Sequence, residues 1–164
     1  MGGESGNDGV VISIGTVERS GVRDGRSYVE IMDGRTFPSR FVFSNNDRKA
    51  RGNHVKKLKL KKGQTVIAIG ARRRFDEIIG WELFRDSGIV SNGVDMAMIG
   101  TLKRKMVSGG KSLIVVRLGG RDYNFNGTAS CELNRKVAVR AKFNGGDIPD
   151  VVALRQVEEK EDVI

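Results

Sequence analysis

The residues of this sequence whose types and spacing best suit binding chemistry form a run of cations. No acidic residue occurs between Arg48 and Arg74. The cations of that span are Arg48, Lys49, Arg51, Lys56, Lys57, Lys59, Lys61, Lys62, Arg72, Arg73 and Arg74. Because like charges repel one another unless an anion neutralises them, the run favours an anion-binding role over an ordinary solvated surface. Binding of a polyanion would release counterions, so its affinity would fall steeply with salt.

Aromatic side chains offer a second kind of contact, because nucleobases stack on flat rings. The aromatic candidates are Tyr28, Phe37, Phe41, Phe43, Trp81, Tyr123 and Phe125. Strand alternation puts Tyr28 on the face opposite the apolar Val29 and Ile31, so we expect its ring to point away from the core. For Phe41, Phe43 and Trp81, alternation leaves open whether the ring belongs to the core or to a stacking surface.

A smaller group of cations lies in the C-terminal half, where Arg121 precedes Tyr123 and the stretch 136–143 alternates in character. One face of that stretch would carry Val137, Val139, Ala141 and Phe143, and the other Lys136, Ala138, Arg140 and Lys142. A strand with this basic face can track a phosphate backbone or simply keep the protein in solution. The pattern alone does not decide between these two roles.

Residues suited to catalysis or metal binding are scarce. His54 and Cys131 are the only histidine and the only cysteine, so one chain cannot assemble a Cys/His zinc site. The segment Gly109-Gly110-Lys111-Ser112 ends like a phosphate-binding loop, but it lacks the first glycine of that motif and leads into a β-branched stretch. We therefore expect a binding protein and not an enzyme, with no cofactor and no metal.

Composition limits the class of protein and its location. The 164 residues carry a formal net charge of +9, with 22 glycines and 2 prolines, which suits short strands joined by tight turns. No apolar run approaches the ~18 residues of a membrane span, and the first residues lack the apolar stretch of a signal peptide. We expect a cytoplasmic protein that does not bind membranes.

The elements that must position these residues are predicted to be strands. Hairpin turns are predicted at Asp24-Gly25 and Asp33-Gly34, and Arg72 to Glu77 is predicted to be a charged turn. Predicted strands span 10–17, 27–32, 35–43, 64–69 and 78–84 in the first half, and 96–102, 112–118, 121–126, 136–143 and 151–154 in the second.

Short matches between the halves indicate an internal repeat with a spacing of about 85 residues. Ile14-Gly15-Thr16-Val17 corresponds to Ile99-Gly100-Thr101-Leu102, and Asp24-Gly25-Arg26-Ser27 corresponds to Gly109-Gly110-Lys111-Ser112. The predicted domains are 10–90 and 94–157, with flexible tails at 1–9 and 158–164.

Five strands with a long connection between the third and the fourth are typical of the OB-fold, a five-stranded Greek-key barrel. The first half resembles OB-fold single-stranded DNA-binding proteins of the bacterial SSB and replication protein A kind. The resemblance rests on Ile14-Gly15-Thr16-Val17, Phe41-Val42-Phe43-Ser44-Asn45 and Leu60-Lys61-Lys62-Gly63-Gln64-Thr65-Val66, and covers roughly residues 10–84. The second half departs from it, since its connector is shorter and lacks the Lys-Gly pair. We expect an all-β chain of two tandem OB-fold-like five-stranded barrels related by an internal repeat.

The resemblance implies binding of single-stranded DNA with little base preference, in replication, recombination or repair. In an OB-fold the loop after the fourth strand borders the ligand groove, so the arginines predicted on that loop are the first candidates. The predicted contact residues are Tyr28, Phe41, Phe43, Lys56, Lys57, Lys59, Lys61, Lys62, Arg72, Arg73, Arg74, Trp81, Arg121, Tyr123, Phe125, Arg140 and Lys142.

Other interpretations stay open. OB-folds also bind RNA, and nothing in the sequence reports on the 2′-hydroxyl. The chain could instead be a structural or assembly protein whose barrels pack into a homo-oligomer, with the basic run contacting an acidic partner. The tail 158–164 is acidic and ends in two apolar residues. In bacterial SSB proteins an acidic tail with an apolar tip recruits replication and repair proteins, so a similar partner role is one interpretation and a frayed end is the other.

Overall fold

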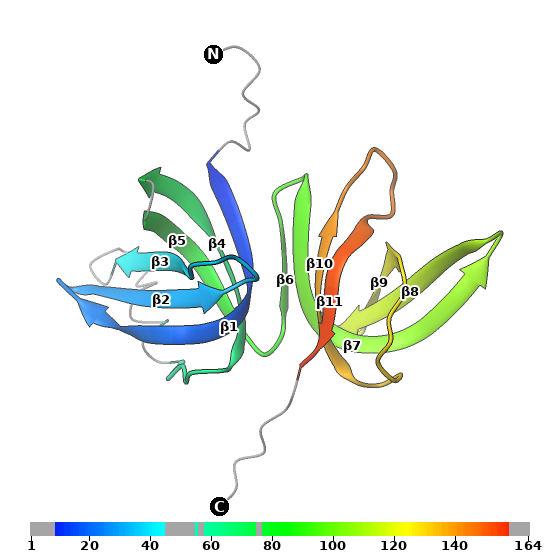
Figure 1. Ribbon diagram of the computed structural model, residues 1–164, viewed down its shortest axis with the longest axis horizontal. Coiled ribbons are helices and arrows are strands. Elements are labelled where there is room, and N and C mark those ends of the chain that lie inside the picture. The colour runs from blue at the N-terminus through cyan, green and yellow to red at the C-terminus, as the bar shows by residue number, and fades with distance from the viewer. Residues whose placement is uncertain (1–8, 45–54, 56–57, 75–76, 158–164) are drawn as a thin grey trace, which may run out of the picture.

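The computed structural model describes residues 9–44, 55, 58–74 and 77–157 of the chain. The described residues form eleven β-strands, which confirms the all-β class (Figure 1). The strands are β1 (Val10–Arg23), β2 (Arg26–Met32), β3 (Ser39–Ser44), β4 (Thr65–Arg74), β5 (Glu77–Arg85), β6 (Gly88–Ser91), β7 (Asp95–Ser108), β8 (Lys111–Leu118), β9 (Arg121–Asn126), β10 (Lys136–Lys142) and β11 (Asp150–Gln156).

The first half of the molecule, β1 to β5, is a closed barrel with the strand order β1-β2-β3-β5-β4. It closes because β4 pairs antiparallel with β1 as well as with β5. The pair β3–β5 is parallel and short, joining Phe41 to Ile78 and Val42 to Ile79. Strand alternation directs one face of each strand inward, and Val17, Val29 and Ile31 are among the residues that fill this interior.

The second half, β6 to β11, is a six-stranded sheet in the order β10-β11-β9-β8-β7-β6, in which β10 also pairs with β7. Strands β7, β8, β9, β11 and β10 therefore follow one another in a ring of the same order as the first half. The pair β9–β11 is again the parallel one, with Asp150 opposite Asn126. Its interior holds a separate apolar cluster that includes Met98, Leu102 and Phe125.

Local details recur at the same positions of the two halves. In β1 a bulge lies between Val17 and Arg19, and in β7 a bulge lies between Leu102 and Arg104. A Cβ added at Gly15 would lie 1.9 Å from the carbonyl oxygen of Met32, and one added at Gly100 would lie 2.7 Å from that of Arg117. Both glycines therefore let their strand approach the neighbouring strand's backbone closely.

The hairpin turns follow the same pattern. Asp24 and Gly25 have φ of 53° and 73°, and Gly109 and Gly110 have φ of 58° and 77°. Two consecutive residues with positive φ form the type I′ turn, whose twist suits a two-residue hairpin. The turn predicted at Asp24-Gly25 is therefore present.

A third apolar cluster joins the two halves. It contains the outward-facing Ile67 of β4 together with residues of β6, β7 and β10, namely Val90, Ala97, Ile99 and Ala138, and also Val157. Figure 1 shows β6 between the two sheets. At the edge of this cluster, Arg155 Nη2 donates a hydrogen bond of 3.2 Å to Thr65 Oγ1, and burial lowers the pKa of Arg155. The halves thus share a packed interface.

The strands predicted at 10–17 and 96–102 extend to Arg23 and Ser108. Three further differences change how elements are assigned. The third strand begins at Ser39 and not at Arg35, because residues 33–38 form an irregular loop that contains Pro38. The fourth strand extends through the arginine triplet to Arg74, because Arg74 pairs with Glu77 of β5. Residues 88–90, predicted to belong to the first domain, pair with β7 of the second sheet.

Candidate nucleic-acid interface

The outer face of β2 and β3 forms the floor of a groove with a volume of about 400 Å³, called here the first groove. Strand pairing sets Tyr28 opposite Val42 and Glu30 opposite Arg40, with these side chains on the face away from the barrel core. The ends of the β1–β2 and β4–β5 hairpins form the walls. The lining residues are Arg23, Asp24, Arg26, Tyr28, Arg40, Val42, Arg74 and Glu77.

Tyr28 lies among arginines in this groove. The guanidinium carbons of Arg23 and Arg40 are 5.7 Å and 5.8 Å from the centre of its ring, within the range of a cation–π contact. Gly21 leaves room for the ring, since a Cβ there would lie 3.2 Å from its atoms. The ring is half-buried, so one aromatic surface is held in a fixed position beside cations.

Two of the four arginines that line the first groove are paired with acids. Arg40 Nη2 donates a hydrogen bond of 2.9 Å to Glu30 Oε1, and Arg26 Nη1 lies 3.6 Å from Glu77 Oε1. Arg23 and Arg74 form no ion pair with any described residue. The Arg40–Glu30 pair lies on the floor, the Arg26–Glu77 pair joins the two walls, and Arg23 and Arg74 offer positive charge at the walls.

A second groove of about 670 Å³ lies on the other side of Arg40. The loop 33–38 and the outer parts of β3, β4 and β5 form it. Its lining residues are Arg35, Thr36, Phe37, Pro38, Ser39, Arg40, Arg72 and Ile78. Arg40 is the lining residue common to both grooves, so the two grooves adjoin at Arg40.

The structure places the predicted aromatic residues in different environments. Tyr28 points away from the core, as predicted. Phe41, Phe43 and Phe125 are fully buried in the interiors of their halves, which corrects their assignment as stacking platforms. For Phe41 and Phe43 alternation was compatible with either face, and the need to fill the interior decided it. Trp81 is 37% exposed, but it lines neither groove.

Trp81 and Tyr123 are positioned by local irregularities and packing. Trp81 is the extra residue of a bulge in β5, since Glu82 pairs with Ile69 and Gly80 pairs with Gly70. Tyr123 is half-buried and packs against the apolar interior of the second half. Neither ring lies beside the cations of the first groove.

The predicted cations do not converge on one site. Arg72 to Arg74 lie on β4 and not on a loop, which corrects the prediction, yet Arg74 lines the first groove and Arg72 the second. Arg73 is exposed. Lys61 and Lys62 are exposed as well, and Lys62 Nζ lies 3.4 Å from Glu18 Oε1.

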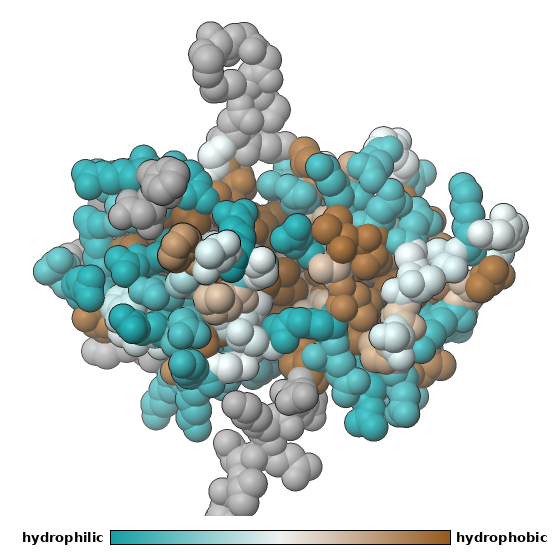
Figure 2. All heavy atoms as spheres, in the orientation of Figure 1, coloured by the Kyte–Doolittle hydropathy of each residue, from teal (hydrophilic) through white to brown (hydrophobic). Residues whose placement is uncertain are grey.

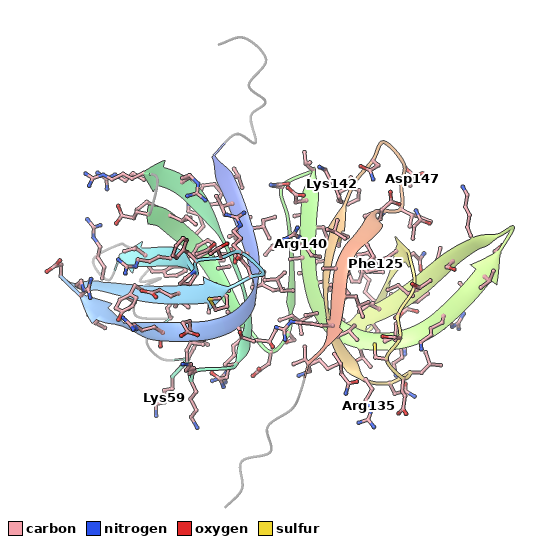
Figure 3. The ribbon with its side chains drawn as sticks, viewed as in Figure 1. Lys59, Phe125, Arg135, Arg140, Lys142 and Asp147 are labelled. Atoms are coloured by element: carbon pink, nitrogen blue, oxygen red, sulfur yellow. The ribbon has the colours of Figure 1, made fainter. Side chains whose placement is uncertain are left out.

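Lys59 lies near Tyr28, because both line a small cavity of about 140 Å³. Lys56, Lys57 and the acidic tail 158–164 lie outside the described residues. In Figure 3 Lys59 lies on the first half, whereas Arg140 and Lys142 project from β10 of the second.

The matching face of the second half is built differently. By strand register, Leu113, Val115 and Asn124 occupy the positions of Tyr28, Glu30 and Arg40. Nearby, the hydrogen bond that Arg117 Nε donates to Asp122 Oδ1, at 2.7 Å, neutralises charge and lowers the pKa of Asp122. Arg121, Arg140 and Lys142 are exposed, but none of them lines either groove.

The surfaces of the halves also differ in hydropathy. In the view of Figure 2, hydrophilic side chains cover most of the first half, whereas apolar side chains gather over β11 of the second. Val152 of β11 is one of the exposed apolar residues. The combination of an outward aromatic ring with arginines in contact with it is found on the first half.

Three arginines of the first groove escaped prediction, namely Arg23, Arg26 and Arg40. They lie outside the acid-free run, and Asp24 stands between Arg23 and Arg26 in the sequence. The signal that could have found them is the pairing of the strands, because an outward Tyr28 on β2 brings the outward residues of β3 beside it.

The remaining searches add nothing to the site. Within the described part of the chain, no group of three or more histidine, cysteine, aspartate or glutamate side chains is arranged to hold a metal ion. No helix there has the length and apolar character that crossing a membrane requires. Comparison of the chain with protein-family models and with curated proteins found no match.

Proposed function

We propose that this protein binds single-stranded DNA, with little preference for base sequence, through the first groove. The observation that carries the proposal is the placement of Tyr28 between two arginines on an open face that cationic hairpin ends border. A nucleobase can stack on the ring while its phosphates contact the guanidinium groups. Duplex DNA is excluded from this mode, because its bases already stack on one another.

We also propose that each half is an OB-fold and that the two arose by duplication. The order of the strands, the parallel third-to-fifth pair, the matching bulges and the matching turns support this. The OB-fold binds its ligands on the face of the second and third strands, between the first-to-second and fourth-to-fifth hairpins. The first groove occupies that face.

In this proposal the halves have different tasks. The first half binds the strand, and the second half packs against it through the shared apolar interface. The action is stoichiometric, with no bond made or broken, and its biological setting is the protection of strands during replication, recombination or repair. RNA is the alternative ligand, because OB-folds bind either polymer and both offer bases and phosphates to the same side chains.

The test is fluorescence anisotropy with labelled single-stranded DNA, RNA of the same sequence and the corresponding DNA duplex, over a salt series. We expect single-stranded DNA to bind more tightly than duplex, with log affinity falling linearly as log salt rises. Equal affinity for single strand and duplex would contradict the stacking contact, and affinity independent of salt would contradict the phosphate contacts. If the protein binds RNA more tightly than DNA, the proposed ligand changes but the proposed site does not.

A further inference from the structure

The second groove carries an exposed aromatic ring that the first groove does not use. Phe37 is 79% exposed, the highest exposure of any large apolar side chain among the described residues. A single exposed apolar side chain is ordinary on a protein surface, but a phenyl ring that lines a groove together with cations has the chemistry of a base-stacking site. The ring stands on the loop 33–38 between β2 and β3.

Two hydrogen bonds to Asp33 anchor the start of the loop that carries Phe37. Asp33 Oδ2 accepts hydrogen bonds from Ser13 Oγ at 2.6 Å and from Ser39 Oγ at 2.9 Å, so it ties the start of the loop to β1 and to β3. Pro38, directly after Phe37, has a fixed φ. The ring is thus presented from an anchored segment, and little order remains to be imposed when a ligand arrives.

Cations surround the exposed ring. Arg35, Arg40 and Arg72 line the same groove as Phe37, together with Pro38, whose ring supplies apolar surface, and the buried Ile78. Apolar surface suits the face of a base, and guanidinium groups suit phosphate oxygens. Arg40 also lines the first groove. A nucleic-acid strand that follows both grooves would therefore pass Arg40 where they adjoin.

We infer that the second groove is a further nucleotide subsite, in which a base stacks on Phe37 while Arg40 contacts the phosphate that links this nucleotide to the one stacked on Tyr28. The inference rests on the proposed function, since it concerns the path of the same strand. The strand would run from the β1–β2 hairpin, across β2 and β3, to the loop 33–38. The second half supplies no comparable ring, because its β8–β9 turn consists of Gly119 and Gly120.

The first experiment places a fluorescent reporter in the subsite. In the Phe37→Trp variant, a base stacked on the new indole should quench its fluorescence as oligothymidylate is added, with the same midpoint as the anisotropy of a labelled strand. Val107→Trp is the matched control, because Val107 is 78% exposed but lies on the β7–β8 hairpin of the second half. Trp81 is present in both variants and supplies a common background.

The second experiment measures affinity against strand length for the parent, Phe37→Ala and Val107→Ala, with oligothymidylates of increasing length. We expect Phe37→Ala to bind long strands about 5- to 100-fold more weakly than the parent, and to bind the shortest strands equally well. The length at which affinity stops rising should be shorter in Phe37→Ala. Val107→Ala should follow the parent.

The outcomes separate the two proposals. If the parent binds single strands but Phe37→Trp shows no quenching beyond that of Val107→Trp, or Phe37→Ala binds every length like the parent, the second subsite is overturned and the first groove stands. If the parent itself binds no single strand in the anisotropy measurement, the proposed function fails and the subsite fails with it. Quenching in Phe37→Trp together with a length-dependent loss in Phe37→Ala supports both.

Discussion

Tyr28 can be tested by giving it the residue of the other half. Replacing it with leucine, as at the matching position Leu113, keeps an apolar side chain but removes the stacking ring and both cation–π contacts. We expect Tyr28→Leu to weaken binding of single-stranded DNA by ~1–3 kcal/mol and to leave the salt dependence nearly unchanged, because no phosphate contact is lost. Anisotropy titrations at several salt concentrations measure both quantities.

The control for Tyr28 is Tyr123→Leu in the second half. Tyr123 packs against the interior of that half and has no cation–π partner among the described residues. Its replacement should leave the affinity unchanged once the variant is shown to be folded. A similar loss of affinity in both variants would mean that the second half also holds a base.

The two arginines of the first groove that form no ion pair with a described residue should control the salt dependence. Replacing Arg23 and Arg74 with glutamine removes positive charge and changes the side-chain volume little. For a single strand, each lost phosphate contact should reduce the slope of log affinity against log salt by about 0.7. Arg121→Gln with Arg140→Gln removes the same charge from the second half and is the control. An equal change of slope in this control would show that the strand also crosses the second half.

At this scale the sequence predicted some residues and not others. Alternation placed Tyr28 outside because Val29 and Ile31, which form the opposite face of β2, are plainly apolar. It could not place Phe41 and Phe43, because both phenyl rings and their neighbour Val42 are apolar, and only closure of the barrel decides which face is interior. Arg40 could not be found without the register of β3 against β2, which is a long-range pairing and not a local pattern.

Within the elements, the close approach of β1 to β2 makes Gly15 a sensitive position. A methyl group there would lie 1.9 Å from the backbone carbonyl oxygen of Met32, so a strand must move. We expect Gly15→Ala to lower the free energy of unfolding by at least ~1–3 kcal/mol, as overpacking does. Urea denaturation followed by circular dichroism measures the change. Gly146→Ala is the control, because a Cβ there meets nothing within 4 Å.

If Gly15→Ala proves as stable as the parent, the backbones of β1 and β2 do not approach as closely as described. Gly100→Ala provides a comparison in the second half, where the corresponding contact is 2.7 Å from the carbonyl oxygen of Arg117. The two glycines should behave alike in sign, because both allow a close approach at the same position of the fold.

Turn chemistry predicted some connections and not others. The turn Asp24-Gly25 was predicted correctly, because its two residues tolerate positive φ and their twist suits the hairpin. Asp33-Gly34 has the same two residue types, yet only Gly34 has a positive φ there. The next strand does not begin until Ser39. The Asp33 carboxylate is engaged by the hydroxyls of Ser13 and Ser39 instead, which are distant in sequence and invisible to a local pattern.

At the scale of the molecule, the short matches between the halves were visible in the sequence because the glycines and turn residues that recur are the ones that backbone geometry requires. The interface between the halves was not visible. Ile67 and Ile99 read as ordinary residues of half-exposed strands, but their outward faces meet and become fully buried. Which outer face of a barrel is covered depends on how the barrels dock, and no local pattern encodes it.

The shared interface predicts that the two halves unfold together, and each half contains a unique probe. Trp81, the only tryptophan, reports on the first half, and Cys131, the only cysteine, reports on the second through the reaction of its half-buried thiol. We expect tryptophan fluorescence and pulsed thiol labelling to give coincident urea transitions in the parent, because separation of the halves would expose the apolar cluster between them.

Ile67→Ala tests this coupling, because Ile67 belongs to the first half but packs in the cluster between the halves. The lost packing should reduce the free energy of unfolding by ~2–5 kcal/mol. If the halves are coupled, the Cys131 transition shifts to lower urea together with the Trp81 transition, although Cys131 lies on the far side of the interface. Val107→Ala, at an exposed position of the second half, should shift neither transition. A shift of the Trp81 transition alone would contradict coupling, and it would mean that the first half unfolds independently of the second.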